Sequence, residues 1–280
     1  MDLTLFIVEK ESMIRFGFFF GMLIVMGVWE TLKPRRVATI SKTSRWVNNL
    51  GLIILNGFVL RLILPITTTG VALLAQKQGW GILNYYSVPK TVNILVFIVV
   101  LDFTIYLQHV MVHAVPLFWR FHRVHHADLD YDVTTGARFH TFEIIFSMFI
   151  KFTAIMLLGP AVIAVILFEI ILNAMAMFNH GNVGLPKALD RFLRYFIVTP
   201  DMHRVHHSVE EDETNSNFGF NLSIWDRLFG TYRAKVRAGQ IDMTIGIKTI
   251  RRPKETNHLL GMLLIPFKHK ISKYVINSTK

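Results

Sequence analysis

The 280-residue sequence contains no cysteine. This absence excludes a disulfide framework, a thiolate zinc site and a cysteine-ligated iron–sulfur cluster. The chain also has no haem-attachment motif and no glycine-rich fingerprint of a dinucleotide-binding protein. Any redox reaction that it performs therefore needs electrons from a separate protein.

Charged residues are scarce as well, at 18% of the chain, whereas hydrophobic residues make up 52%. The mean hydropathy is +0.42, which indicates a membrane protein. The formal net charge of +11 is carried by basic residues that lie between and after apolar segments, and no nucleic-acid-binding module is present. We therefore expect anionic lipid head groups, and no nucleic acid, as partners of these basic residues.

The apolar segments predict an all-α integral membrane bundle of about four to five spans. Residues 13–29 are long enough to cross a bilayer core, and we interpret them as an uncleaved anchor because no small-residue cleavage site follows. The basic loop at 33–45 is then expected in the cytoplasm, with the N-terminus on the other side. Residues 50–76 and 92–106 form the next apolar segments.

Two further apolar runs, 142–158 and 161–178, are separated by Gly159 and Pro160. Because this dipeptide stops a helix and favours a turn, we predict a helical hairpin that leaves and re-enters the membrane on one side. Lys151 inside the first arm indicates snorkelling or shallow insertion. Beyond the hairpin, residues 188–198 are amphipathic and either lie in the membrane interface or form an ordinary packing helix.

These segments divide the chain into four predicted regions. They are N-terminal transmembrane helices (1–108), a first cytosolic histidine region (109–141), a transmembrane hairpin (142–179) and a helical cytosolic cap with an amphipathic tail (180–280).

Eight histidines fall in three short boxes at the ends of the predicted spans. Residues three and four apart share one face of a helix, so each box aims its imidazoles in one direction. Eight imidazoles exceed what one ion can bind, so the sequence predicts two metal ions. The boxes are His109 and His113; His122, His125 and His126; and His203, His206 and His207. His140 and His180, which flank the hairpin, complete the ten predicted ligands.

Carboxylates near the boxes are candidates for holding the ligands in place, because a metal-bound imidazole usually donates its other N–H to a carboxylate or carbonyl. Asp102 lies seven residues before His109 on the same helical face, and Glu143 lies three residues after His140. His258 and His269 lie outside the boxes, and we assign them ordinary structural roles.

The order of these motifs resembles that of the fatty acid hydroxylase/sterol desaturase superfamily, over residues from about Asp102 to Tyr232. The shared features are the three boxes, the run from Arg138 through His140 to Glu143, the pair His180 and Asn182, and the closing runs Asn217–Gly219 and Trp225–Tyr232. Two positions depart from the pattern. Thr141 stands where the family usually has proline, and Ala176 stands where some members have a further histidine, which lowers the ligand count or leaves a position open to water.

The resemblance implies a membrane enzyme whose helical bundle and cytosolic cap hold two iron ions, with zinc as a substitute in isolated protein. Such enzymes use O2 and electrons from a separate electron-transfer protein to hydroxylate or desaturate a C–H bond of a lipid, such as a fatty acyl chain or a sterol. The implied location is a bacterial inner membrane or the endoplasmic reticulum, with the histidine boxes on the cytosolic side.

Two other functions stay open at this point. One is a non-redox lipid hydrolase or isomerase in which zinc activates water. The other is a metal transporter or sensor, which would place ionisable residues inside the spans. Iron content together with O2 consumption separates the first alternative from an oxygenase, and metal flux into vesicles tests the second.

Overall fold

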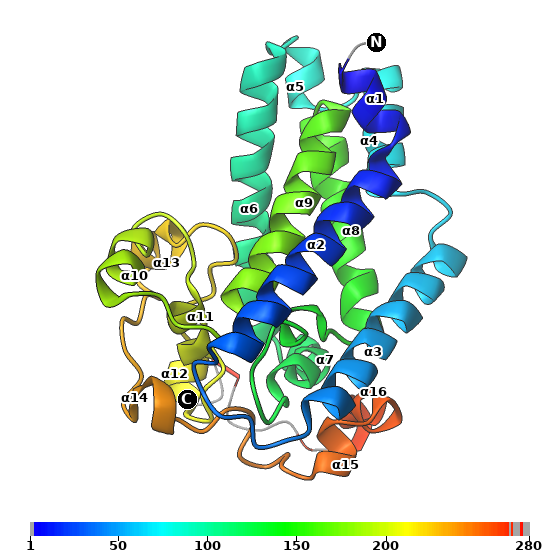
Figure 1. Ribbon diagram of the computed structural model, residues 1–280. Coiled ribbons are helices and arrows are strands. Elements are labelled where there is room, and N and C mark those ends of the chain that lie inside the picture. The colour runs from blue at the N-terminus through cyan, green and yellow to red at the C-terminus, as the bar shows by residue number, and fades with distance from the viewer. Residues whose placement is uncertain (1–2, 269, 271–274, 277–280) are drawn as a thin grey trace.

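The computed structural model describes residues 3–268, 270 and 275–276, and it is helical throughout, with no strand among these residues (Figure 1). His269 lies outside the described residues. The N-terminal half comprises α1 (Leu3–Glu9), α2 (Glu11–Leu32), α3 (Lys42–Ile63), α4 (Thr68–Gln78), α5 (Ile82–Tyr85), α6 (Lys90–Ala114), α7 (Pro116–His126) and the 3-10 turn η1 (Thr135–Ala137). The remainder comprises α8 (Thr141–Leu158), α9 (Val162–Asn179), α10 (Lys187–Leu193), α11 (Pro200–His206), α12 (Glu211–Thr214), α13 (Ile224–Leu228), α14 (Gly239–Asp242), α15 (Pro253–Thr256) and α16 (Leu259–Lys268).

Five helical segments among the described residues are long and apolar enough to cross a membrane, which confirms the predicted all-α bundle of four to five spans. They are Glu11–Leu32, Lys42–Tyr85, Lys90–Ala114, Thr141–Leu158 and Val162–Asn179. The last of these, α9, is the most buried, because α2, α4 and α6 pack around it. Their contact surfaces form an apolar core that includes Phe97, Leu101 and Phe168.

The two ends of the bundle differ in character. Figure 1 shows the N-terminus and α5 at one end, and the short helices α10 to α15 together with α7 and α16 at the other. The basic loop at 33–41 joins α2 to α3 at this second end, which we call the cap end. Within the loop, Arg35 forms an ion pair with Asp201 at 2.8 Å, so the loop is fastened to the cap.

The structure confirms the helical hairpin around Gly159. This residue has φ 63°, and a Cβ added to it would lie 2.2 Å from the carbonyl oxygen of Trp80. Only glycine tolerates both the left-handed backbone and this close approach. After the turn, the N–H of Ala161 donates to Asn93 Oδ1 at 2.7 Å, which ties the start of α9 to α6.

Lys151 has an ion-pair partner on a neighbouring helix, which the sequence analysis did not identify. Its Nζ lies 3.3 Å from Glu169 Oε1 on α9, and its side chain is 14% exposed. Glu169 also accepts from Arg15 at 2.6 Å and from Thr68 at 3.0 Å. Four helices thus share one buried charge cluster within the bundle, as expected for charges that must leave water together.

Two amphipathic segments of the cap end behave differently. Phe192 of α10 and nearby Phe196 are 60% and 57% exposed, as expected of a helix at the membrane interface and not of one packed on its apolar face. In contrast, α16 buries Met262 and Ile265 against Trp119 of α7 and Leu52 of α3. The tail helix therefore closes the cap end beneath the histidine-bearing helix α7.

Candidate metal centre

Nine of the ten predicted ligands come together in two groups that could each hold a metal ion. Within each group, one donor atom of every residue lies within 4.8 Å of the others, and every imidazole is at most 6% exposed. The first group is His109, His113, His122, His126 and His206. The second group is His125, His180, His203 and His207.

The two groups are adjacent because α7 and α11 each contribute to both. Consecutive residues of a helix point about 100° apart, so His125 of α7 faces the second group while His126 faces the first. On α11 and its C-cap, His206 faces the first group while His203 and His207 face the second. The rings of His126 and His207 stack at 4.6 Å between centroids, which makes the two groups parts of one centre.

Local sequence explains how these helices reach their positions. Pro116 lacks an N–H and disfavours helix at the residue before it, so α6 ends after His113 and α7 starts afresh at Pro116. At α11 the side chain of Thr199 caps the first turn by accepting from the N–H of Met202, and Pro200 occupies the first helical position. Both histidine-bearing helices are therefore short and separately oriented.

The first group presents its Nε2 atoms to a common point. His109 Nδ1 donates to the carbonyl oxygen of Phe218 at 2.8 Å, and His206 Nδ1 donates to that of Ser216 at 2.8 Å. His122 Nδ1 lies 2.6 Å from Glu143 Oε1. The Nε2 atoms of these three histidines are buried and have no hydrogen-bond partner among the described residues. Each therefore offers an unused lone pair that can bind a metal ion.

The second group fits a cation for a related reason. His180 Nδ1 donates to the carbonyl oxygen of Ala176 at 2.8 Å, which leaves its Nε2 without a proton in the neutral ring. This Nε2 lies 3.1 Å from Nε2 of His125 and 3.1 Å from Nε2 of His203. Two further ring nitrogens thus lie close to the unprotonated Nε2 of His180, as expected of histidine ligands that share one metal ion.

The protonation state of these imidazoles is also the one that metal binding requires. Burial lowers the pKa of His180 and His206 to about 3, and nearby histidines add to the effect at His206. Burial likewise holds the pKa of His125, His203 and His207 well below the usual value. These rings are neutral at pH 7, and the neutral imidazole is the form that binds metal.

His140, the tenth predicted ligand, lies outside both groups. It is the N-cap of α8, where its Nδ1 accepts from the N–H of Phe142 at 3.2 Å. Its Nε2 donates to the carbonyl oxygen of Leu263 on α16 at 3.3 Å. Both ring nitrogens are therefore used in starting one helix and fastening another.

The two carboxylates proposed as ligand supports also differ in outcome. Glu143 contacts a boxed histidine, but this is His122 and not its sequence neighbour His140. Asp102 contacts none of the histidines, because seven residues of helix correspond to about 10 Å along the axis. Its Oδ2 accepts instead from Trp225 Nε1 at 2.8 Å and from the N–H of Leu222 at 3.3 Å, which fixes the cap to α6.

Comparison with known proteins agrees with the motif order. A family model described as fatty acid hydroxylase matches residues 94–231, which include both groups. This match and the relatives below support the resemblance to the fatty acid hydroxylase/sterol desaturase superfamily. No solved structure matches it.

The relatives that the chain matches include enzymes named for several lipids. The chain is 29% identical to the ornithine lipid hydroxylase OlsE of Rhizobium tropici over 67% of this chain and 54% of the relative. It is 32% identical to the alkylglycerol monooxygenase of Xenopus tropicalis over 47% of this chain and 28% of the relative. It is 23% identical to human cholesterol 25-hydroxylase over 50% of this chain and 51% of the relative. The chain thus spans about half or less of the length of these relatives.

Several supports of the centre carry no sequence signal. The acceptors for His109, His180 and His206 are backbone carbonyls, and any residue supplies one. One further support, Asp226, lies in the closing run Trp225–Tyr232 of the motif order. Asp226 accepts from the N–H groups of Phe218 and Gly219 at 2.7 and 2.8 Å, and so it positions the carbonyl that His109 contacts.

Proposed function

We propose that this protein is a membrane-bound di-iron oxygenase that uses O2 and external electrons to hydroxylate a C–H bond of a lipid. One observation carries the proposal. Nine buried imidazoles form two adjacent groups that could each hold a metal ion, at the end of a bundle of candidate membrane spans. The names of its relatives favour hydroxylation over desaturation, since they are hydroxylases and monooxygenases.

The donor set supports iron as the metal. Both groups consist of imidazoles alone, and imidazole suits iron as well as zinc, copper and nickel. Two iron ions held by these groups would supply the activation of O2. We assign His109, His113, His122, His126 and His206 to one ion, and His125, His180, His203 and His207 to the other.

The surrounding side chains serve to exclude water from that centre. Trp119 packs on His113 with 4.8 Å between ring centroids, and Phe139 stacks on His125 at 4.5 Å. Phe218 lies against His109 and His113 at 5.6 and 5.1 Å. These apolar rings give the reacting C–H bond a dry environment, while the protein's helices hold the lipid in position; the oxidation itself belongs to the metal ions.

The position of the centre suits a lipid substrate and a soluble electron donor. The histidine-bearing helices lie at the cap end, together with the basic loop at 33–41 (Figure 1). Basic loops favour the cytosolic side, so we place the cap end, formed by residues 109–141 and 180–280, in the cytosol. A lipid then reaches the centre from the bilayer, and electrons arrive from a separate redox protein in the cytosol.

The ionisable residues inside the candidate spans give little support to the alternative function of a metal transporter. Arg15, Lys151 and Glu169 are close to one another, and Glu169 pairs with both cations. A carboxylate that pairs with cations from two other helices is typical of a structural contact between helices.

The proposal is tested on purified full-length protein in nanodiscs, supplied with iron, a reductant and candidate lipids. Two iron ions per chain, O2 consumption that depends on lipid, and a product heavier by one oxygen atom from 18O2 are expected. The variant H258A is the control, since His258 is exposed and belongs to neither group. Hydrolysed or isomerised lipid formed with zinc alone, without O2 uptake, would instead establish the non-redox alternative.

A further inference from the structure

A pocket of about 260 Å³ with several charged side chains in its lining lies at the cap end between the C-terminus of α2 and the N-terminus of α3. A single side chain, that of Tyr131, separates it from the two histidine groups. Tyr131 lines the pocket, and its ring lies 5.5 Å from that of His180 and 5.0 Å from that of His207. The pocket is therefore a neighbour of the candidate metal centre and has its own opening.

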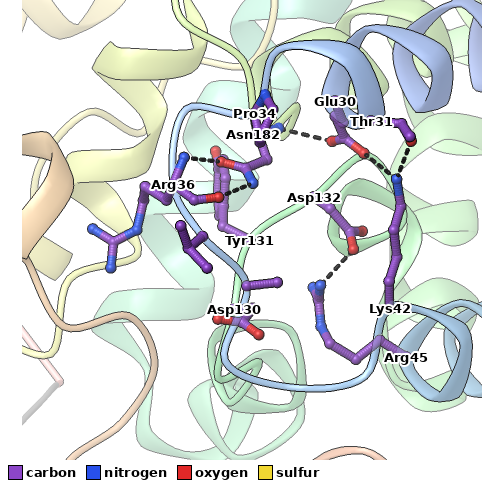
Figure 2. A pocket seen from close by; sticks show the side chains of 12 residues that line it. Glu30, Thr31, Pro34, Arg36, Lys42, Arg45, Asp130, Tyr131, Asp132 and Asn182 are labelled. Atoms are coloured by element: carbon purple, nitrogen blue, oxygen red, sulfur yellow. Dashed lines mark hydrogen bonds and ion pairs between the residues drawn. The ribbon is translucent and has the colours of Figure 1, made fainter.

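Most charged side chains around this pocket have their polar groups occupied (Figure 2). Both oxygens of Asp130 accept from Thr39 and Ile40, and those of Asp132 accept from Thr134 and Arg45. Arg45 also pairs with Asp128. Arg36 points away from the pocket and donates to the carbonyl oxygens of Gln240 and Met243. The side chains of Asp130, Asp132, Arg45 and Arg36 therefore already have hydrogen-bond partners within the protein.

Glu30 and Lys42 are the exceptions. Glu30 is 4% exposed, and its Oε1 accepts from the N–H groups of Val133 and Asn182 at 2.7 Å each. Its Oε2 is buried and has no hydrogen-bond partner among the described residues. Lys42 Nζ lies 3.9 Å from this oxygen and donates to Thr31 Oγ1 at 2.9 Å. The pocket thus presents one carboxyl oxygen without a hydrogen-bond partner beside an ammonium group that can donate further hydrogen bonds.

A ligand that matches this pair carries a hydrogen-bonding cation next to an anion. A primary ammonium would donate to Glu30 Oε2, and a neighbouring phosphate or carboxylate would accept from Lys42 Nζ. The volume suits a group the size of phosphoethanolamine or an amino acid. We propose that this pocket binds a zwitterionic group of that kind, presented by a membrane lipid.

The position of the pocket favours a lipid head group as the source. Glu30 and Lys42 lie at the cap-end termini of two candidate spans, α2 and α3, which is where head groups meet the protein. Val37, which lines the pocket, is 89% exposed, and Leu32 at the end of α2 is 79% exposed. A bound amine-bearing lipid would thus keep its acyl chains beside the bundle. This inference goes beyond the proposed oxygenase, since it concerns binding and needs no turnover.

The experiment measures binding to the full-length protein in phosphatidylcholine nanodiscs, with phosphatidylethanolamine added in steps. Trp46 is a native reporter, because Lys42 Nζ lies 5.2 Å from its ring centroid, and W46F shows which part of the fluorescence change comes from it. A saturable change is expected with phosphatidylethanolamine. Phosphatidylcholine, whose quaternary amine has no N–H to donate, is expected to bind at least about tenfold more weakly, which corresponds to one charge-assisted hydrogen bond.

The variant E30Q tests the key oxygen with little risk to the fold. Its amide oxygen keeps the two backbone hydrogen bonds, while an NH2 group replaces the unpartnered Oε2. We expect about tenfold weaker binding in E30Q and K42M, and unchanged binding in K33M, since Lys33 is an exposed neighbour outside the pocket. Equal binding by E30Q, or equal competition by phosphatidylcholine, would overturn the proposal.

A parallel titration with free phosphoethanolamine in phosphatidylcholine nanodiscs distinguishes the source of the ligand. Saturation only by the lipid supports the head-group site as stated, whereas equal saturation by the free compound would overturn the assignment to a lipid. The metal content of each variant is measured alongside. Unchanged metal content with lost binding assigns the loss to the pocket and not to the histidine groups.

Discussion

His125 and His126 are adjacent in sequence, yet their imidazoles belong to different groups of the candidate metal centre. Their ring planes are perpendicular, at 90°. This arrangement requires a helix at the position of the second box, because two consecutive residues of a strand would point to opposite faces and could not both line one compact centre. The division of the candidate centre into two histidine groups thus depends in part on a single turn of α7.

The first prediction concerns the variants H125A and H126A. Each is expected to reduce the metal content from two ions to about one per chain, and each is expected to abolish lipid hydroxylation, because the reaction needs both ions. Metal content is measured by mass spectrometry of the purified protein. H258A is expected to keep both ions. Two ions retained in either box variant would contradict the assignment of these residues to separate ions.

The second prediction concerns Glu143, which acts through His122. In E143A the Nδ1 of His122 loses its acceptor, and we expect metal affinity to fall by about 10- to 100-fold. In E143Q the amide oxygen can still accept this hydrogen bond, so the loss is expected to be smaller. Competition with a chelator measures both affinities. Equal losses in the two variants would show that the charge, and not the hydrogen bond, is what the site requires.

Several parts of this architecture could be predicted from sequence because their signals are local. The Gly159–Pro160 dipeptide marks the hairpin, and the spacing of the boxes marks which imidazoles share a helical face. His140 and His180 look alike at this level, since both lie next to a hairpin arm. Only the packing of α16 on α8 shows that His140 is occupied by the carbonyl of Leu263. The partner of Lys151 is hidden for the same reason, because Glu169 is 18 residues away on another helix.

The third prediction concerns the charge cluster inside the spans. The substitution E169L leaves Arg15 and Lys151 without a counter-charge, and removing one partner of a buried pair costs about 3–5 kcal/mol. K151M is expected to cost less, because Arg15 and Thr68 still contact Glu169. Unfolding in detergent measures both free energies. If E169L proves as stable as the parent protein, the cluster contributes nothing to the stability of the bundle.

The fourth prediction concerns Gly136, which lies beneath His180. A Cβ at this position would lie 2.5 Å from the carbonyl oxygen of Ala176 and 3.1 Å from His180 Nδ1. G136A is therefore expected to displace the hydrogen bond that orients His180 and to weaken metal binding in the second group while leaving the first group loaded. Metal stoichiometry measures this. Gly230, whose added Cβ would meet nothing within 4 Å, offers the control G230A, although its positive φ adds a small backbone cost.

The last prediction concerns the pH dependence of stability, and it depends on Asp226. Burial raises the pKa of this carboxyl to about 6, while hydrogen bonds from Thr231, Gly219 and Phe218 partly oppose the rise. Since the pKa is higher in the folded protein than in the unfolded chain, folding favours the protonated form. This contribution to stability is complete below about pH 4 and is lost as the pH rises through about 6.

The variant D226N isolates this contribution, because asparagine does not titrate. The parent protein is expected to lose stability relative to D226N between pH 4 and pH 7, by up to about 3 kcal/mol at roughly 1.4 kcal/mol per pH unit. The weaker hydrogen bonding of asparagine to Phe218 and Gly219 adds an offset that does not change with pH. The contributions of groups that D226N leaves unchanged cancel in the difference between the two proteins. A difference in unfolding free energy that stays constant over this range would show that Asp226 keeps its ordinary pKa in the folded protein.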